Sequence, residues 1–119
     1  LIDPEAIART IQLLSAERYS EVLTLYFEQA EATVEQMRHA VRDAQPLALG
    51  THAHATRGAA LNLGLPALAA VAKALQDGAA HLPAHEVARL VQQFAELIPA
   101  TREAARAAAL LPGTARLAG

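Results

Sequence analysis

The chain has 119 residues, of which 53% are hydrophobic, 3% aromatic and 18% charged, with a formal net charge of −2 and no cysteine. This length fits one domain, and without cysteine there is neither a disulfide framework nor a thiolate metal site. The charge argues against binding of nucleic acid, and no apolar run is long enough to span a bilayer or form a signal peptide. We therefore expect a domain that contacts neither nucleic acid nor membrane directly.

The first predicted helix is short, with Asp3 as its N-cap and Ile7, Ile11 and Leu14 along one side. Ser15 is the expected cap of a second, longest helix. Apolar residues recur there at steps of three and four for about six turns; they are Tyr19, Val22, Leu23, Tyr26, Phe27, Ala30, Val34, Met37 and Val41.

Three further helices are predicted over residues 46–63, 66–77 and from about 83 onward, because prolines stand at the start of each periodic segment. Gly64 and Gly78 follow two of these segments, where a positive φ would close the helix. Pro99 falls inside the last pattern and predicts a kink or a break. The inward positions of the last two helices are Leu68, Val71, Ala72, Leu75, Val87, Leu90, Val91, Phe94, Leu97, Ile98 and Thr101.

Short connections between long helices predict an all-α fold, an antiparallel four-helix bundle with a short extra N-terminal helix. We assign residues 1–110 to the bundle and residues 111–119, which have no apolar period, to a loose tail. The chain begins with Leu and its one Met is residue 37, so we expect it to be part of a longer protein.

The third predicted helix has an unusual face. At 100° per residue, about 60° at most separates His54 from each of a set of neighbours, namely Leu47, Gly50, Thr51, Arg57, Gly58 and Leu61. The opposite face is mostly apolar and consists of Leu49, His52, Thr56, Ala59, Ala60 and Leu63. If that face packs into the bundle, His54 points to solvent.

This combination of residues suits phosphoryl transfer onto an imidazole. Gly50 and Gly58 each cost about 1 kcal/mol against Ala in a helix, and a missing Cβ lets another molecule approach closely. An exposed imidazole is mostly uncharged at neutral pH and is a nucleophile, and Arg57 would favour the charge of a phosphoryl group. From the residues alone, an incidental surface His54 and a packing role for Gly58 stay open.

Residues 54–64, HATRGAALNLG, resemble the signature of histidine-containing phosphotransfer (HPt) domains. In that family the active His is followed at +3 by a basic residue, usually Lys, at +4 by Gly, and at +10 by the Gly that ends the helix. The resemblance covers about residues 2–105, since a long aromatic-bearing helix precedes the motif and another helix follows it.

The resemblance implies a role for several residues. His54 would be the phosphoacceptor, Arg57 would replace the usual Lys, and Gly58 would provide clearance. Gln76 stands where relatives often have a polar residue that reaches the imidazole, although ordinary surface polarity is the alternative. Thr56 departs from the usual apolar residue, and we expect its hydroxyl to bond to the His52 carbonyl.

Other histidines are weaker candidates. His52 faces the bundle on the helical wheel, so we interpret it as a partly buried, hydrogen-bonded side chain. His81 and His85 lack the surrounding ligands of a metal pair, and we expect no metal site. His39 stands between basic residues and is expected to be solvated.

The resemblance implies a phosphorelay intermediate. The sequence has no Gly-rich nucleotide loop, so we expect a phosphoryl carrier that does not bind ATP. A response-regulator receiver domain would donate the phosphoryl group and hold Mg²⁺, and the domain itself would bind no cofactor. Docking would use Leu47, Thr51, Ala55, Gly58 and Leu61 together with the short first helix.

The same resemblance implies a monomeric, cytoplasmic module at the C-terminus of a bacterial hybrid sensor histidine kinase. A free-standing shuttle, the phosphoacceptor domain of a chemotaxis-type kinase and a non-catalytic helical adaptor are the alternatives.

Overall fold

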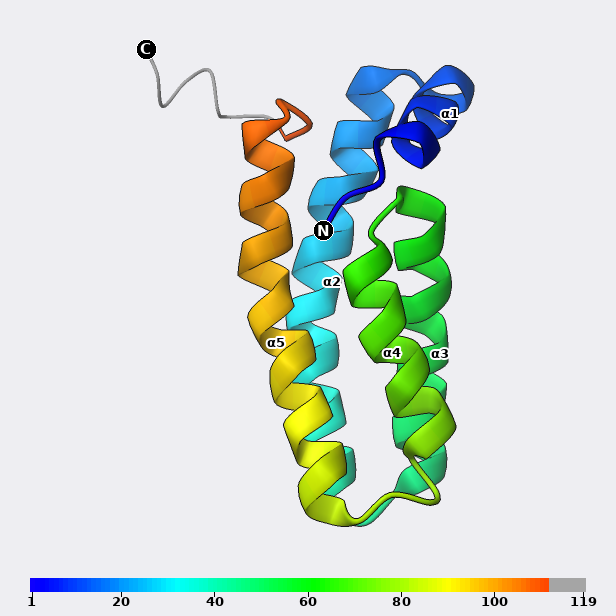
Figure 1. Cartoon of the computed structure of the whole chain (residues 1–119), viewed down its shortest axis with the longest axis vertical. Coiled ribbons are helices and arrows are strands. Elements are labelled where there is room, and N and C mark those ends of the chain that lie inside the picture. The colour runs from blue at the N-terminus through cyan, green and yellow to red at the C-terminus, as the bar shows by residue number, and fades with distance from the viewer. Residues whose placement is uncertain (112–119) are drawn as a thin grey trace.

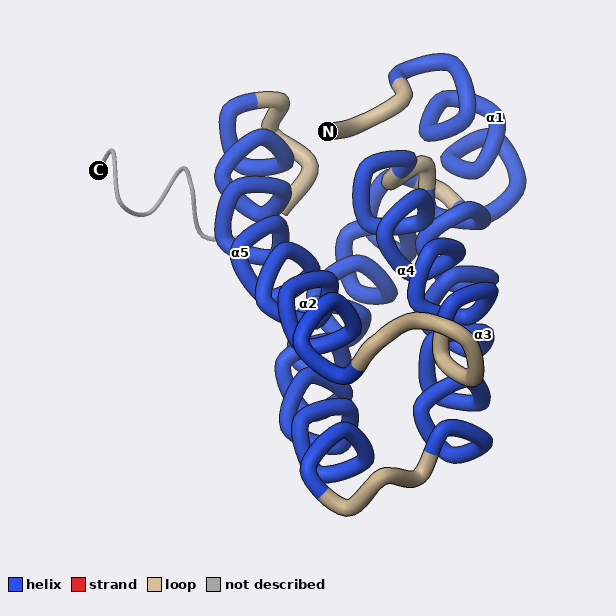
Figure 2. The backbone as a smooth tube through the Cα atoms, turned by 60° about the horizontal axis from the view of Figure 1, so that its bottom comes forward, coloured by secondary structure: helices blue, strands red, loops and turns tan. Residues whose placement is uncertain are grey.

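The computed structural model describes residues 1–111, and this part of the chain forms five helices and no strand (Figures 1 and 2). They are α1 (Pro4–Leu14), α2 (Ala16–Arg42), α3 (Pro46–Leu63), α4 (Pro66–Gly78) and α5 (Ala84–Ala107). The main contacts join α2 to α3, α3 to α4, α4 to α5 and α5 back to α2, while α1 packs on α2 and α3. The predicted four-helix bundle with a short N-terminal helix is confirmed. Residues 112–119 of the predicted tail lie outside the described residues.

The helix starts follow the predicted signals. Asp3 accepts a hydrogen bond from the backbone N–H of Ala6 at 3.3 Å, and Ser15 accepts one from Arg18 at 3.2 Å. These side chains satisfy N–H groups that have no partner inside the helix. Among residues 1–111, no helix is long and apolar enough to cross a membrane.

Gly64 ends α3 and also seats α1 on the bundle. Its φ of 77° is left-handed, and a Cβ at this position would lie 2.8 Å from Ile7 Cγ1. The backbone N–H of Asp3 donates to the Gly64 carbonyl at 2.8 Å, and Thr10 Oγ1 donates to the Asn62 carbonyl at 3.1 Å. A glycine is required here both for the turn and for the close approach of α1.

The expected positive φ at Gly78 was wrong, and of the two alternatives for Pro99 a break in the helix is excluded. Gly78 is the last residue of α4 and does not have a positive φ. A Cβ there would lie 2.9 Å from Leu82 Cγ, so the glycine makes room for the following loop. Pro99 does not split the last helix, because α5 continues through it from Ala84 to Ala107.

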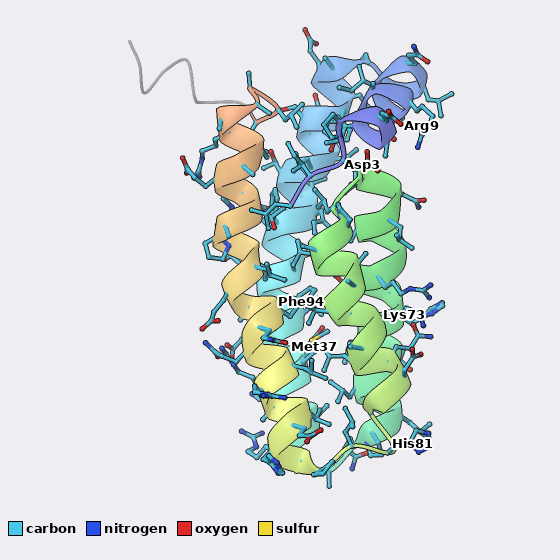
Figure 3. The ribbon with its side chains drawn as sticks, viewed as in Figure 1. Asp3, Arg9, Met37, Lys73, His81 and Phe94 are labelled. Carbon is cyan, nitrogen blue, oxygen red and sulfur yellow. The ribbon has the colours of Figure 1, made fainter. Side chains whose placement is uncertain are left out.

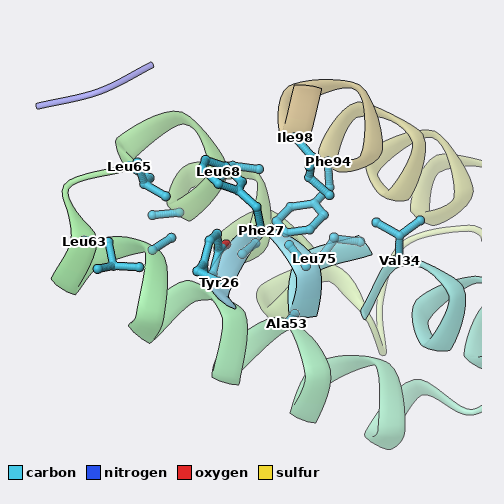
Figure 4. Packing of buried hydrophobic residues seen from close by; sticks show 14 of the residues in the cluster. Tyr26, Phe27, Val34, Ala53, Leu63, Leu65, Leu68, Leu75, Phe94 and Ile98 are labelled. Carbon is cyan, nitrogen blue, oxygen red and sulfur yellow. The ribbon is translucent and has the colours of Figure 1, made fainter. Parts of the chain in front are cut away.

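The core lies along the inner faces of α2–α5, where Phe27, Leu75 and Phe94 meet (Figure 4). Tyr19, Leu23, Met37, Leu68 and Phe94 are completely buried. Val22 and Leu14 were expected on inward faces, but they are 36% and 40% exposed. Leu14 is the last residue of α1, and Val22 lies in the first half of α2.

Candidate functional site

Two tyrosines of α2 hold α3 in place. The Tyr19 hydroxyl donates to the Leu63 carbonyl at 2.6 Å, and the Tyr26 hydroxyl lies 2.9 Å from Thr56 Oγ1. The partners are seven residues apart on each helix, which is two turns. These buried bonds set which face of α3 turns inward. They also correct the expected partner of Thr56, whose hydroxyl pairs with Tyr26 across the interface.

The opposite face of α3 is exposed around His54. His54 is exposed and His52 is half-buried, in agreement with the orientation predicted for each. Ideal Cβ atoms built on Gly50 and Gly58 have no neighbouring atom within 4 Å, so neither glycine is needed for helix packing. Here the absence of a side chain leaves open space around the imidazole.

Apolar side chains flank this open surface on α3. Leu47 is 86% exposed and Leu61 is 52% exposed, about 21 Å apart along the helix axis at 1.5 Å per residue. Thr51, Ala55 and Gly58 are exposed between them. All five residues predicted for partner docking are therefore accessible on one face. On α1, Leu13 is also 86% exposed.

His54 and Gln76 line the same groove between α3 and α4. Its volume is about 370 Å³, and its lining residues are Pro46, Leu47, Gly50, Thr51, His54, Gln76, Asp77, Ala79, Ala80 and His81. Gln76 is half-buried, and its Oε1 is buried with no hydrogen-bond partner among the described residues. A buried amide oxygen without a donor is unusual. Gln76 thus brings an unpaired acceptor close to the groove that His54 lines.

Charged residues meet beside this groove. Lys73 Nζ donates to Asp77 Oδ2 at 2.7 Å. This hydrogen bond lowers the pKa of the Asp77 carboxyl, with smaller contributions from the positive charges of Lys73 and Arg57. Asp77 therefore stays ionised. Its ion pair with Lys73 lies at the groove that His54 lines.

Three residues at this site had not been assigned to it from the sequence. Asp77 and His81 line the groove, and Lys73 pairs with Asp77. Lys73 and His81 lie on the same outer side of the bundle, away from α5 (Figure 3). The spacing of Lys73 and Asp77, one turn apart in α4, marks a helical ion pair. Nothing in the spacing showed that this pair would border α3.

The remaining histidines lie elsewhere. His85 and His39 are exposed on α5 and α2, and neither lines the groove of His54. Within residues 1–111, no three side chains of His, Asp or Glu are grouped so as to hold a metal ion.

A comparison with protein families relates the chain to known domains. The sequence model of one family, described as the Hpt domain, matches residues 21–108, which include all of α3, α4 and α5 and most of α2. The match leaves out α1. No curated protein matches the chain.

Proposed function

This chain belongs to the Hpt domain family, whose members serve phosphotransfer in two-component signalling, and we propose that it is a phosphorelay intermediate acting through His54. In this proposal a receiver domain of a response regulator donates a phosphoryl group from an aspartyl phosphate, and a second receiver accepts it. The observation that carries the proposal is an exposed imidazole on a face of α3 that two glycines leave open.

The transfer is a displacement at phosphorus. The lone pair of His54 Nε2 attacks, and the N–P bond forms as the bond from phosphorus to the aspartyl oxygen breaks. The carboxylate leaves with the electron pair. Nδ1 keeps its proton, so the product is an imidazolium that carries the phosphoryl group. Transfer to the second receiver reverses these steps, and nothing is oxidised or reduced.

Arg57 and Gln76 stabilise different parts of this product. Arg57 follows His54 by one turn on the same side of α3, and its guanidinium offsets charge on the phosphoryl oxygens. Gln76 lines the groove together with His54, and its Oε1 is buried without a hydrogen-bond partner among residues 1–111. It accepts the Nδ1–H of the charged imidazolium, which fixes the ring and leaves Nε2 toward the partner. Mg²⁺ held by the receiver would supply further charge stabilisation.

The receiver docks on the face formed by Leu47, Thr51, Ala55, Gly58 and Leu61. Apolar side chains at both ends and small residues in the centre favour a close, partly dry contact around His54. Leu13 on α1 extends the exposed apolar surface. The domain itself acts as a carrier and does not bind ATP.

The proposal extends to the parent protein, a hybrid sensor histidine kinase in which this domain is a cytoplasmic module. Its monomeric state when isolated is part of the same proposal. A chemotaxis-type kinase domain would instead be phosphorylated directly by an ATP-binding kinase module, without a receiver. A non-catalytic adaptor would take up no phosphate.

Phosphoryl transfer from charged receivers tests this function. A panel of purified receiver domains is incubated with acetyl phosphate and Mg²⁺, freed of the reagent and mixed with the domain. We expect acid-labile, base-stable phosphate on the wild type and none on His54→Gln. His52→Gln is the matched control and should retain transfer. Failure of the wild type with every receiver, or normal labelling of His54→Gln, would contradict the proposal.

A further inference from the structure

An ion pair of α4, formed by Lys73 and Asp77, lies at the groove that His54 lines. Asp77 lines the groove itself, and its carboxylate accepts a hydrogen bond from Lys73 Nζ at 2.7 Å. Arg57 lies on α3, one turn after His54, and its positive charge makes a small contribution to the lowered pKa of Asp77. A phosphoryl group on His54 would therefore enter a groove whose carboxylate is already paired with Lys73.

We propose that Asp77 is a positioning residue that competes with the phosphoryl group of His54 for Arg57 and Lys73, and thereby limits how much phosphoryl group His54 holds at equilibrium. This inference rests on the proposed function. The chemical step is unchanged: the N–P bond of His54 and the O–P bond of the receiver aspartate exchange as described above. Asp77 alters only the balance between the two phosphorylated partners.

The direction in which each side chain shifts the transfer equilibrium follows from its charge. A phosphoryl group carries about −1.5 to −2 charges at neutral pH. Asp77 repels it and also draws Lys73 and Arg57 toward itself, whereas Lys73 attracts the phosphoryl group and offsets Asp77. The Lys73 and Asp77 side chains are 57% and 61% exposed, so solvent weakens these effects. We expect changes of about threefold to tenfold in the transfer equilibrium, a size typical of partly screened charges.

Few other charged side chains are placed to act on Asp77 or on a phosphoryl group at His54. The titratable or charged side chains that line the groove or act on Asp77 are His54 and Arg57 from α3, Lys73 from α4 and His81 from the loop after α4. A weakly held phosphoryl group is useful to a carrier, because the group must leave His54 for the next receiver. Asp77 would provide this by opposing the stabilisation from Arg57.

The equilibrium constant for transfer between one charged receiver and the domain tests the inference. It is measured from the share of phosphate on each protein after the mixture stops changing. Asp77→Asn should raise the share on His54 by about threefold to tenfold, and Asp77→Glu should resemble the wild type. Lys73→Gln should lower that share by a similar factor. High salt should shrink both differences.

The opposite signs separate this role from a structural one. Both Asp77→Asn and Lys73→Gln remove the same surface ion pair, so a structural role would move both variants in one direction. Thermal unfolding should show that both variants keep the fold. Equal equilibria for wild type and Asp77→Asn, or shifts of the same sign, would overturn the inference while leaving the proposed function intact. Absence of transfer to the wild type would overturn both.

Discussion

The Tyr26 hydroxyl lies 2.9 Å from Thr56 Oγ1 inside the bundle, on the side of α3 opposite to the exposed His54. Thr56 follows His54 by two residues, so the two side chains point about 160° apart on the helix. The hydrogen bond between Tyr26 and Thr56 thus joins α2 to α3 and turns the imidazole outward. A buried contact determines the orientation of a surface site.

This contact predicts a measurable coupling in stability. Tyr26→Phe leaves the buried Thr56 hydroxyl without its partner, and we expect the free energy of unfolding to fall by about 1–2 kcal/mol. Thr56→Val should cost a similar amount. The double variant should lose less than the sum, because no unpaired polar group is left. Urea unfolding measures all three, and strictly additive losses would show that the bond contributes nothing.

Substitutions at Gly58 distinguish a role in partner access from a role in helix packing. Because a Cβ at Gly58 meets nothing within 4 Å, Gly58→Ala should raise the free energy of unfolding by about 0.5–1 kcal/mol. Gly58→Leu should also fold normally, but it should slow transfer to His54 at least tenfold, since its side chain occupies the partner's approach. Ala100→Leu, an exposed change on α5, is the control. Loss of folding in Gly58→Leu would contradict this role.

Gln76 provides a test with opposite effects on activity and stability. Gln76→Leu removes a buried oxygen that has no partner among residues 1–111, so the free energy of unfolding should stay unchanged or rise. Transfer to His54 should slow about threefold to tenfold, because the Nδ1–H of the imidazolium loses its acceptor. Transfer assays quenched at successive times measure the rate, and thermal unfolding measures the stability. A less stable variant with normal transfer would assign Gln76 to packing.

The tyrosines of α2 predict the response to alkaline pH. Burial raises the pKa of Tyr19 from 10.0 to about 12, whereas the unfolded chain ionises near 10. Because the folded state holds the proton more tightly, the stabilisation is complete below about pH 10 and is lost as the pH rises to about 12. Denaturant unfolding across this range should show the decline in the free energy of unfolding. Tyr19→Phe should make this pH dependence weaker. Phenolate absorbance of Tyr19 in the folded protein at pH 10 would argue against a raised pKa for this residue.

Much of the fold could be predicted because its signals are local. Asp3 and Ser15 cap helices by bonds to residues three positions ahead, and the apolar period of α2 extends over many turns. The outward direction of His54 and the inward direction of His52 followed from the helical wheel alone. Expectations failed where a residue far away in the sequence decided the outcome, as when Thr56 paired with Tyr26 of α2 and not with the His52 carbonyl.

The sequence by itself determined the five helices, the face of α3 that carries His54 and the likeness of residues 54–64 to a phosphotransfer motif. Helical period and capping depend on neighbouring residues, which the chain order states directly. Only the tertiary structure decided that Gln76, Asp77 and His81 share a groove with His54, and that Thr56 pairs with Tyr26. These relations depend on how α3 packs against α4 and α2, because packing sets the rotation of each helix and the distance between their side chains.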